Sequence, residues 1–79
     1  MRARVYVTLK PEVLDPQGEA VRKGLASLGI AGVKNVRVGK LIEIDVDGDR
    51  AAVERELREA ADKLLANVVI EDYRVEIDG

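Results

Sequence analysis

The chain has 79 residues, a formal net charge of −2, and neither cysteine nor histidine. A chain of this length forms one small domain, residues 1–79, with a modest hydrophobic core. The missing residue types exclude disulfides, the common zinc sites, cysteine nucleophiles and histidine bases. The acidic pI, near 5.1, argues against a surface for nucleic acid or for an anionic membrane. We therefore expect a cytoplasmic protein without its own metal or cofactor, stabilised by association with other chains.

The first third of the sequence predicts a strand followed by a capped helix. Residues 3–9 alternate between apolar and polar side chains, as in a half-buried strand, and Pro11 ends that strand. Asp15 is a suitable N-cap, and Pro16 suits the first helical position, where its missing N–H needs no partner. Gly29 stands where a left-handed C-cap belongs. The apolar side of this helix comprises Val21, Leu25 and Leu28.

The middle of the sequence predicts a hairpin. Val36 and Val38 alternate with Arg37, and residues 42–46 alternate in the same way. The link between them contains Gly39 and Lys40, which indicates a turn of a type that the sequence leaves open. We therefore expect two antiparallel strands over residues 32–38 and 42–46.

The last third predicts a second helix and a final strand. Asp49 is a plausible N-cap, and Glu54 and Arg58 lie four residues apart on the outer face, as a weak ion pair. Residues 68–77 predict the strand, with alternate side chains on one face. The apolar stripe of the helix comprises Val53, Leu57, Ala60 or Ala61, Leu64 and Leu65.

The predicted order is β-α-β-β-α-β, which is the ferredoxin-like pattern of the α+β class. We expect a two-layer sandwich, with a four-stranded antiparallel sheet and both helices on one face of it. The opposite face of the sheet, which carries Tyr6 and Thr8, is then uncovered. We accordingly expect a homodimer, or a dimer of dimers, that uses this face or the edge strands.

Residue patterns argue against several activities known for folds of this shape. A metal-transfer domain needs cysteines, and an RNA-recognition module needs aromatic residues on its central strands, where only Tyr6 is available. Gly39-Lys40 lacks the spacing of a phosphate-binding loop, and Leu41 stands where that loop has serine or threonine. Acidic pairs such as Asp47 and Asp49 are typical of turns and helix caps. A ligand-sensing regulatory module remains possible.

Several sequence blocks carry a more specific signal. Residues 5–11 and 13–18, which include Leu-Asp-Pro-Gln-Gly, resemble the opening of the PurS family, the small subunit of phosphoribosylformylglycinamidine synthase. The resemblance continues through residues 36–40, 63–67 and 69–73, in order and at the family's spacing. It covers nearly the whole chain, except the middle of the second helix.

This resemblance implies a function. The complex converts formylglycinamide ribonucleotide, glutamine and ATP into formylglycinamidine ribonucleotide in purine biosynthesis, as a carbon–nitrogen ligase. A PurS-like chain would be non-catalytic and would bridge the synthetase (PurL) and glutaminase (PurQ) subunits, assisting ammonia transfer between them. ATP and magnesium would belong to the synthetase subunit. The alternative is a stand-alone ligand-sensing module of similar fold.

The blocks also select candidate interface residues, because polar residues at the ends of elements often mediate recognition. These candidates lie at the entrance of the first helix, at the link before residue 41, and before and within the last strand. They are Asp15, Pro16, Gln17, Gly18, Arg37, Gly39, Lys40, Asn67, Glu71, Asp72 and Tyr73.

Overall fold

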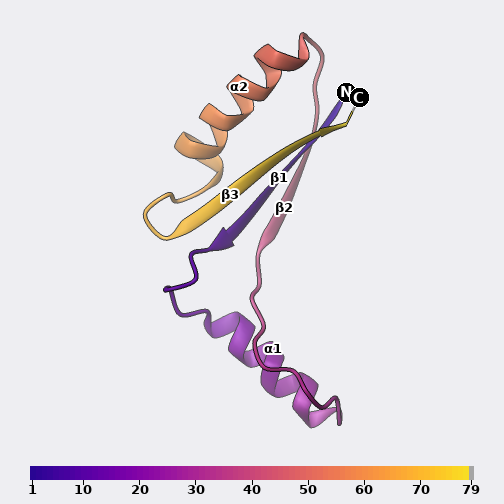
Figure 1. Cartoon of the computed structure of the whole chain (residues 1–79), viewed down its shortest axis with the longest axis vertical. Coiled ribbons are helices and arrows are strands. Elements are labelled where there is room, and N and C mark those ends of the chain that lie inside the picture. The colour runs from indigo at the N-terminus through magenta and orange to yellow at the C-terminus, as the bar shows by residue number, and fades with distance from the viewer. Residues whose placement is uncertain (79) are drawn as a thin grey trace.

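The computed structural model describes residues 1–78 and divides them into two parts (Figure 1). One part is a sheet covered by a helix. The other is an arm that lies beyond the end of the sheet and is formed by α1, a turn at residues 28–29 and the extended residues 30–39. The molecule is accordingly elongated, with principal extents of 48 × 26 × 14 Å. The elements are β1 (Arg2–Leu9), α1 (Pro16–Ser27), β2 (Lys40–Asp45), α2 (Arg50–Ala60), a π-helical turn η1 (Ala61–Leu65) and β3 (Glu71–Asp78).

The sheet has three strands in the order β2-β1-β3, all antiparallel to their neighbours. Val5 of the central strand lies opposite Ile42 on one side and Val75 on the other. The expected alternation along β1 is confirmed, because every second residue from Ala3 to Val7 is buried. The same face of the two outer strands therefore contributes the remaining apolar side chains of the sheet.

The helix α2 covers this apolar face. Asp49 caps it as expected, with its carboxylate accepting a hydrogen bond from the Ala52 amide at 3.1 Å. Val53, Leu57 and Ala61 are buried, so the predicted stripe holds over the first three turns. Leu64 of the same stripe is exposed, because the chain leaves the helical path through η1 and turns toward β3.

The expectation of a fourth strand over residues 32–38 is wrong, and so is the hairpin. This segment is extended but pairs with no strand of the described chain, and it runs through Gly39 directly into β2. The physical reason is that a side chain, and not a strand, accepts a backbone hydrogen bond from this segment. The Val38 amide donates to the Asp15 side chain at the start of α1, rather than to a carbonyl of a neighbouring strand. The segment therefore lies along α1, as Figure 1 also shows.

The expectation that both helices cover one face of the sheet is also wrong. The two apolar clusters of the core contain residues of the sheet, α2, η1 and the residue that follows, and none from α1. The ends of α1 nonetheless agree with the sequence. Asp15 is its N-cap, Pro16 begins it, and Gly29 follows it with a φ of 81°. Local sequence signals thus predicted the bounds of the helix correctly, but they did not predict that it packs away from the sheet.

The face of the sheet opposite α2 is polar. The Tyr6 hydroxyl donates to Glu76 at 3.0 Å, and the Arg74 guanidinium lies over the Tyr6 ring, 4.4 Å from its centroid. The flanking ion pairs join Arg2 to Glu43 and Asp45, and Arg4 to Asp78. Leu41, which lies opposite Tyr6 in the register, adds a half-exposed apolar side chain to this face. Within the described residues, no helix has the length and apolar character needed to cross a membrane.

Candidate subunit interface

Asp15 is the most constrained of the candidate residues. Its side chain is 8% exposed, and each carboxylate oxygen accepts one backbone hydrogen bond of 2.8 Å. Oδ1 accepts from the Gly18 amide, and Oδ2 accepts from the Val38 amide. The Val38 and Gly18 amides hold the pKa of the carboxyl below its ordinary value, because they stabilise the charged form. Asp15 therefore joins the start of α1 to the segment that precedes β2.

Two candidate glycines lie where backbones come close together. A Cβ on Gly18 would be 2.0 Å from the carbonyl oxygen of Val36, and a Cβ on Gly39 would be 2.7 Å from that of Val7. Neither glycine has a positive φ, so space rather than conformation requires it. The first approach brings the extended segment onto α1, and the second brings it onto the end of β1.

Arg37 provides a third link at the base of the arm. Its Nη2 donates to the carbonyl oxygens of Lys10 at 2.9 Å and Val13 at 2.8 Å. These two carbonyls belong to the loop that joins β1 to α1. The side chain thus fixes that loop against the returning segment. Pro16, another candidate, lies beside Arg37 along a surface hollow that also includes Asp15.

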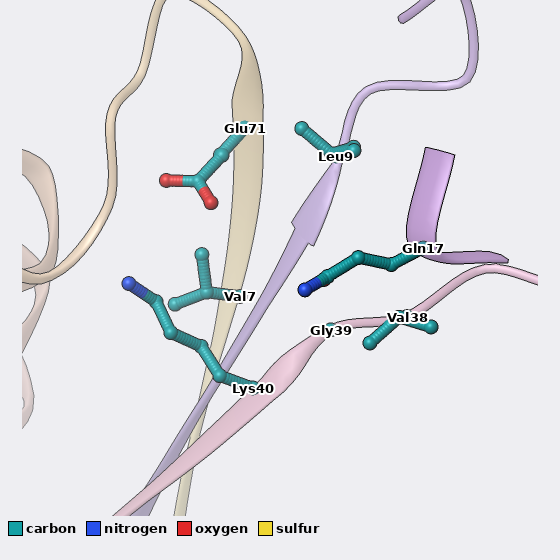
Figure 2. Close-up of a pocket in the computed structure, with 7 residues that line it drawn as sticks. All are labelled: Val7, Leu9, Gln17, Val38, Gly39, Lys40 and Glu71. Atoms are coloured by element: carbon teal, nitrogen blue, oxygen red, sulfur yellow. The ribbon is translucent and has the colours of Figure 1, made fainter. Parts of the chain in front are cut away.

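Four candidates line one cavity of about 230 Å³ on the helix-covered side of the sheet. Figure 2 shows the Lys40 ammonium, the Glu71 carboxylate and the Gln17 amide on different sides of Val7. Lys40 lies opposite Val7 in the register, and Glu71 lies opposite Leu9, so both share the inner face at the end that α2 leaves open. The structure therefore brings together residues from three separate sequence blocks. The cavity is lined by Val7, Leu9, Gln17, Val38, Gly39, Lys40 and Glu71.

The remaining candidates belong to β3 and the turn before it. Asn67 organises that turn, since its carbonyl oxygen accepts from the amides of Ile70 and Glu71, while its own amide donates to Glu71 Oε1 at 2.7 Å. Tyr73 packs against the apolar core cluster. Asp72 is exposed and lies opposite Thr8, on the polar face of the sheet. The structure therefore separates Asp72 from the cavity.

Exposed apolar side chains are a feature that the sequence reasoning did not select. Residues 68–70 were expected in the last strand, but they form a turn before β3 and are exposed, Val69 by 80%. Leu14 and Leu28 at the two ends of α1 are exposed as well. In sequence, residues 68–70 follow the apolar pattern of the strand, which is why their exposure was not foreseen.

Chemically, these surfaces are suited to recognition. Among the described residues, no group of three or more acidic, histidine or cysteine side chains is arranged to hold a metal ion. Lys40 and Glu71 offer one cation and one anion at a cavity open to solvent, and residues 68–70 add an apolar surface next to Glu71. An apolar patch beside charged groups is the usual anatomy of a protein interface.

Comparison with known proteins identifies the family. Residues 2–79 match the family model described as PurS, phosphoribosylformylglycinamidine (FGAM) synthase. The chain belongs to the PurS family. A curated relative from Synechocystis, named as the PurS subunit of phosphoribosylformylglycinamidine synthase, is 52% identical over 94% of this chain and 75% of its own length.

Solved structures agree with this assignment. The PurS structure from Methanocaldococcus jannaschii has a TM-score of 0.88 and 38% identity, covering 98% of this chain and 94% of the other. Its description makes it one of the subunits of formylglycinamide ribonucleotide amidotransferase in the purine biosynthetic pathway. A chain of the PurLQS structure from Thermotoga maritima has a TM-score of 0.81 and 28% identity, covering 95% and 93% of the two chains.

These matches confirm the main functional prediction from the sequence. The chain is a PurS-type subunit of FGAM synthase, a ligase complex of purine biosynthesis. They also agree with the α+β architecture of two helices and an antiparallel sheet. The stand-alone regulatory module receives no support from them.

Proposed function

We propose that this subunit bridges the synthetase and glutaminase subunits of FGAM synthase and assists ammonia transfer between them. The observation that carries the proposal is the convergence of Gln17, Lys40 and Glu71 on one cavity in a chain of this family. Support for partners of this kind comes from the Thermotoga maritima relative, whose structure is described as PurLQS. ATP and magnesium act in the synthetase subunit, and the assembly works in the cytoplasm.

The proposed surface for the larger subunits consists of the cavity and the adjacent turn. Lys40 and Glu71 give a charged rim, and Val69 with its neighbours in residues 68–70 gives an apolar centre. The hydrogen bonds made by Asn67 hold that turn in shape before any partner binds. A preformed turn lowers the entropy lost on association.

As part of the same proposal, two copies of the chain pair through their arms, and this pairing can extend to a dimer of dimers. Val21, Leu28 and Ile30 are exposed on the arm, and a chain this small has limited burial of its own. Covering these side chains would remove apolar surface from water, which stabilises the pair by about 25 cal/mol for each Å² that is buried. The polar face of the sheet carries Leu41 among several paired charges, so it offers less apolar surface to such a contact.

Reconstitution of the complex tests the bridging role. With the two larger subunits alone, ammonia-dependent synthesis should persist and glutamine-dependent synthesis should collapse, because free ammonia is diluted and protonated before it reaches the synthetase. Adding this chain should restore the glutamine-dependent rate. A full glutamine-dependent rate without this chain would overturn the proposal.

Charge reversal tests the proposed surface separately. Lys40→Glu and Glu71→Lys should each weaken co-purification with the larger subunits, because each reverses a charge at the rim of the cavity. Arg55→Glu is the matched control, since Arg55 is exposed on the outer side of α2. Circular dichroism must show that all three variants are folded. Assembly that survives both cavity variants would exclude this surface.

A further inference from the structure

The arm reaches its position without a hydrophobic core between it and the sheet. Gly18 is the one buried residue of α1, and both apolar core clusters lie in the other part of the molecule. Figure 1 shows α1 extending beyond the ends of the strands rather than lying on the sheet. Within one chain, contacts other than hydrophobic packing must therefore set its direction.

We propose that Asp15, Gly18 and Arg37 form a clamp that fixes the direction of the arm relative to the sheet. The clamp is a conformational device of the single chain. It does not depend on the identity of any partner. All three residues lie at the base of the arm, where the loop after β1 meets the segment that returns to β2.

The carboxylate of Asp15 performs two separable tasks. Oδ1 caps α1 through the Gly18 amide, which is a local interaction, whereas Oδ2 holds the Val38 amide, 23 residues further along the chain. A helix cap needs only one acceptor, and serine supplies it as well as aspartate does. The second oxygen is therefore explained by the clamp and not by the cap.

The other two clamp residues act on the same crossing. Gly18 lets the Val36 carbonyl come so near to α1 that no side chain fits between them. Arg37, on the returning segment, donates hydrogen bonds to the carbonyls of Lys10 and Val13, which lie on the loop that enters the arm. Together the three residues join both chain segments that connect the arm to the sheet, so a rotation of the arm must break several of these contacts at once.

A distance measurement between the two parts of the molecule tests the clamp. The chain has no cysteine, so Ala26→Cys on α1 and Arg55→Cys on α2 allow two spin labels to be attached selectively. Pulsed electron–electron double resonance then reports the distance between the two labels. Diluting labelled chains in unlabelled ones ensures that both labels belong to one chain. The test variants are Asp15→Ser, which keeps the cap, and Arg37→Met, which removes the donors at similar length. Glu19→Gln is the control, since its carboxylate accepts from Arg22 within α1.

The clamp predicts one narrow distance distribution for the parent chain and for Glu19→Gln. Asp15→Ser and Arg37→Met should lose the single narrow peak and give a broad distribution, while circular dichroism shows unchanged helix content. If Asp15→Ser also loses helix, Arg37→Met decides, because Arg37 lies outside α1. Narrow, unshifted distributions in folded Asp15→Ser or in Arg37→Met would overturn the clamp.

Discussion

The two parts of this molecule are held in place by different forces. In the sheet and α2, apolar side chains from distant parts of the sequence bury one another, as Ala3, Val53 and Leu57 do. In the arm, α1 keeps its apolar side chains largely at the surface, and backbone hydrogen bonds to Asp15 and Arg37 set its position. The comparison teaches that whether a segment forms a helix and where that helix packs are determined by different interactions. Good caps and a stripe of apolar residues made α1 a helix without giving it a place on the sheet.

The largest expected effect comes from cutting a core side chain in the first part. Leu57 is 8% exposed, so Leu57→Ala should lower the free energy of unfolding by about 2–3 kcal/mol. Leu28 in the arm is 77% exposed, so Leu28→Ala should change it by less than about 0.5 kcal/mol within one chain. Urea denaturation measures both values. Equal losses would contradict the division into two differently stabilised parts.

The next effect contrasts two glycines of the same helix. Gly18→Ala should destabilise the chain by about 1–3 kcal/mol, because the new Cβ would overlap the Val36 carbonyl oxygen. Gly24→Ala should stabilise it by about 0.4–1 kcal/mol, since that position is open and alanine favours helix. Thermal denaturation should show shifts of opposite sign. Two stabilising shifts would mean that the crossing at Gly18 is not tight.

A pH titration examines the base of the arm alone. The amides of Val38 and Gly18 lower the pKa of Asp15 from its ordinary value of 3.8. Since the folded value is the lower one, the carboxylate stabilises the fold above about pH 4, and this contribution disappears as the pH falls through the folded value. The two amide proton resonances should stay constant from pH 7 to 5 and move only below pH 4.

The amide of Leu28, which donates to backbone carbonyls of α1, provides an internal reference for that titration. Its resonance should change less than those of Val38 and Gly18 while the helix persists. A transition of the Val38 amide centred above pH 4 would contradict the role given to Asp15.

The smallest effect belongs to the exposed ion pairs of α2. Arg58 and Glu54 are 3.0 Å apart, four residues along the helix, and both side chains are about half exposed. Arg58→Gln should lower stability by about 0.3–0.5 kcal/mol at low salt, and by less at 1 M salt, where surface charges are screened. A loss above about 1 kcal/mol would show that charge pairs, and not the buried stripe, hold α2.

Much of the fold could be predicted because its signals are local. Alternation marked β1, Asp15 and Asp49 marked the two helix starts, and Gly29 marked the end of α1. Residues 32–38 were wrongly predicted as a strand, because alternating β-branched residues give the same pattern whatever group accepts their backbone hydrogen bonds. Here the acceptor for the Val38 amide is the carboxylate of Asp15, and no local sequence pattern reveals that contact.

The sequence pointed to the polar residues around the cavity, but not to their arrangement or to the apolar residues beside them. The sequence blocks contained Gln17, Lys40 and Glu71, yet their meeting around Val7 depends on the register of three strands and on the path of the arm. The exposed residues 68–70 escaped notice because they continue the apolar pattern of β3. Burial is a tertiary property, and a single sequence gives it only through periodicity.

The position of β1 at the centre of the sheet has a consequence for biosynthesis. Its partner β2 begins at Lys40 and its partner β3 at Glu71, so both edges of β1 lack neighbours when the strand first leaves the ribosome. At roughly 5–20 residues per second, several seconds separate the synthesis of β1 from that of β3. Sheets closed by such distant pairings also form slowly. During this interval the nascent segment exposes the apolar face formed by Ala3, Val5 and Val7, and this exposed face favours aggregation.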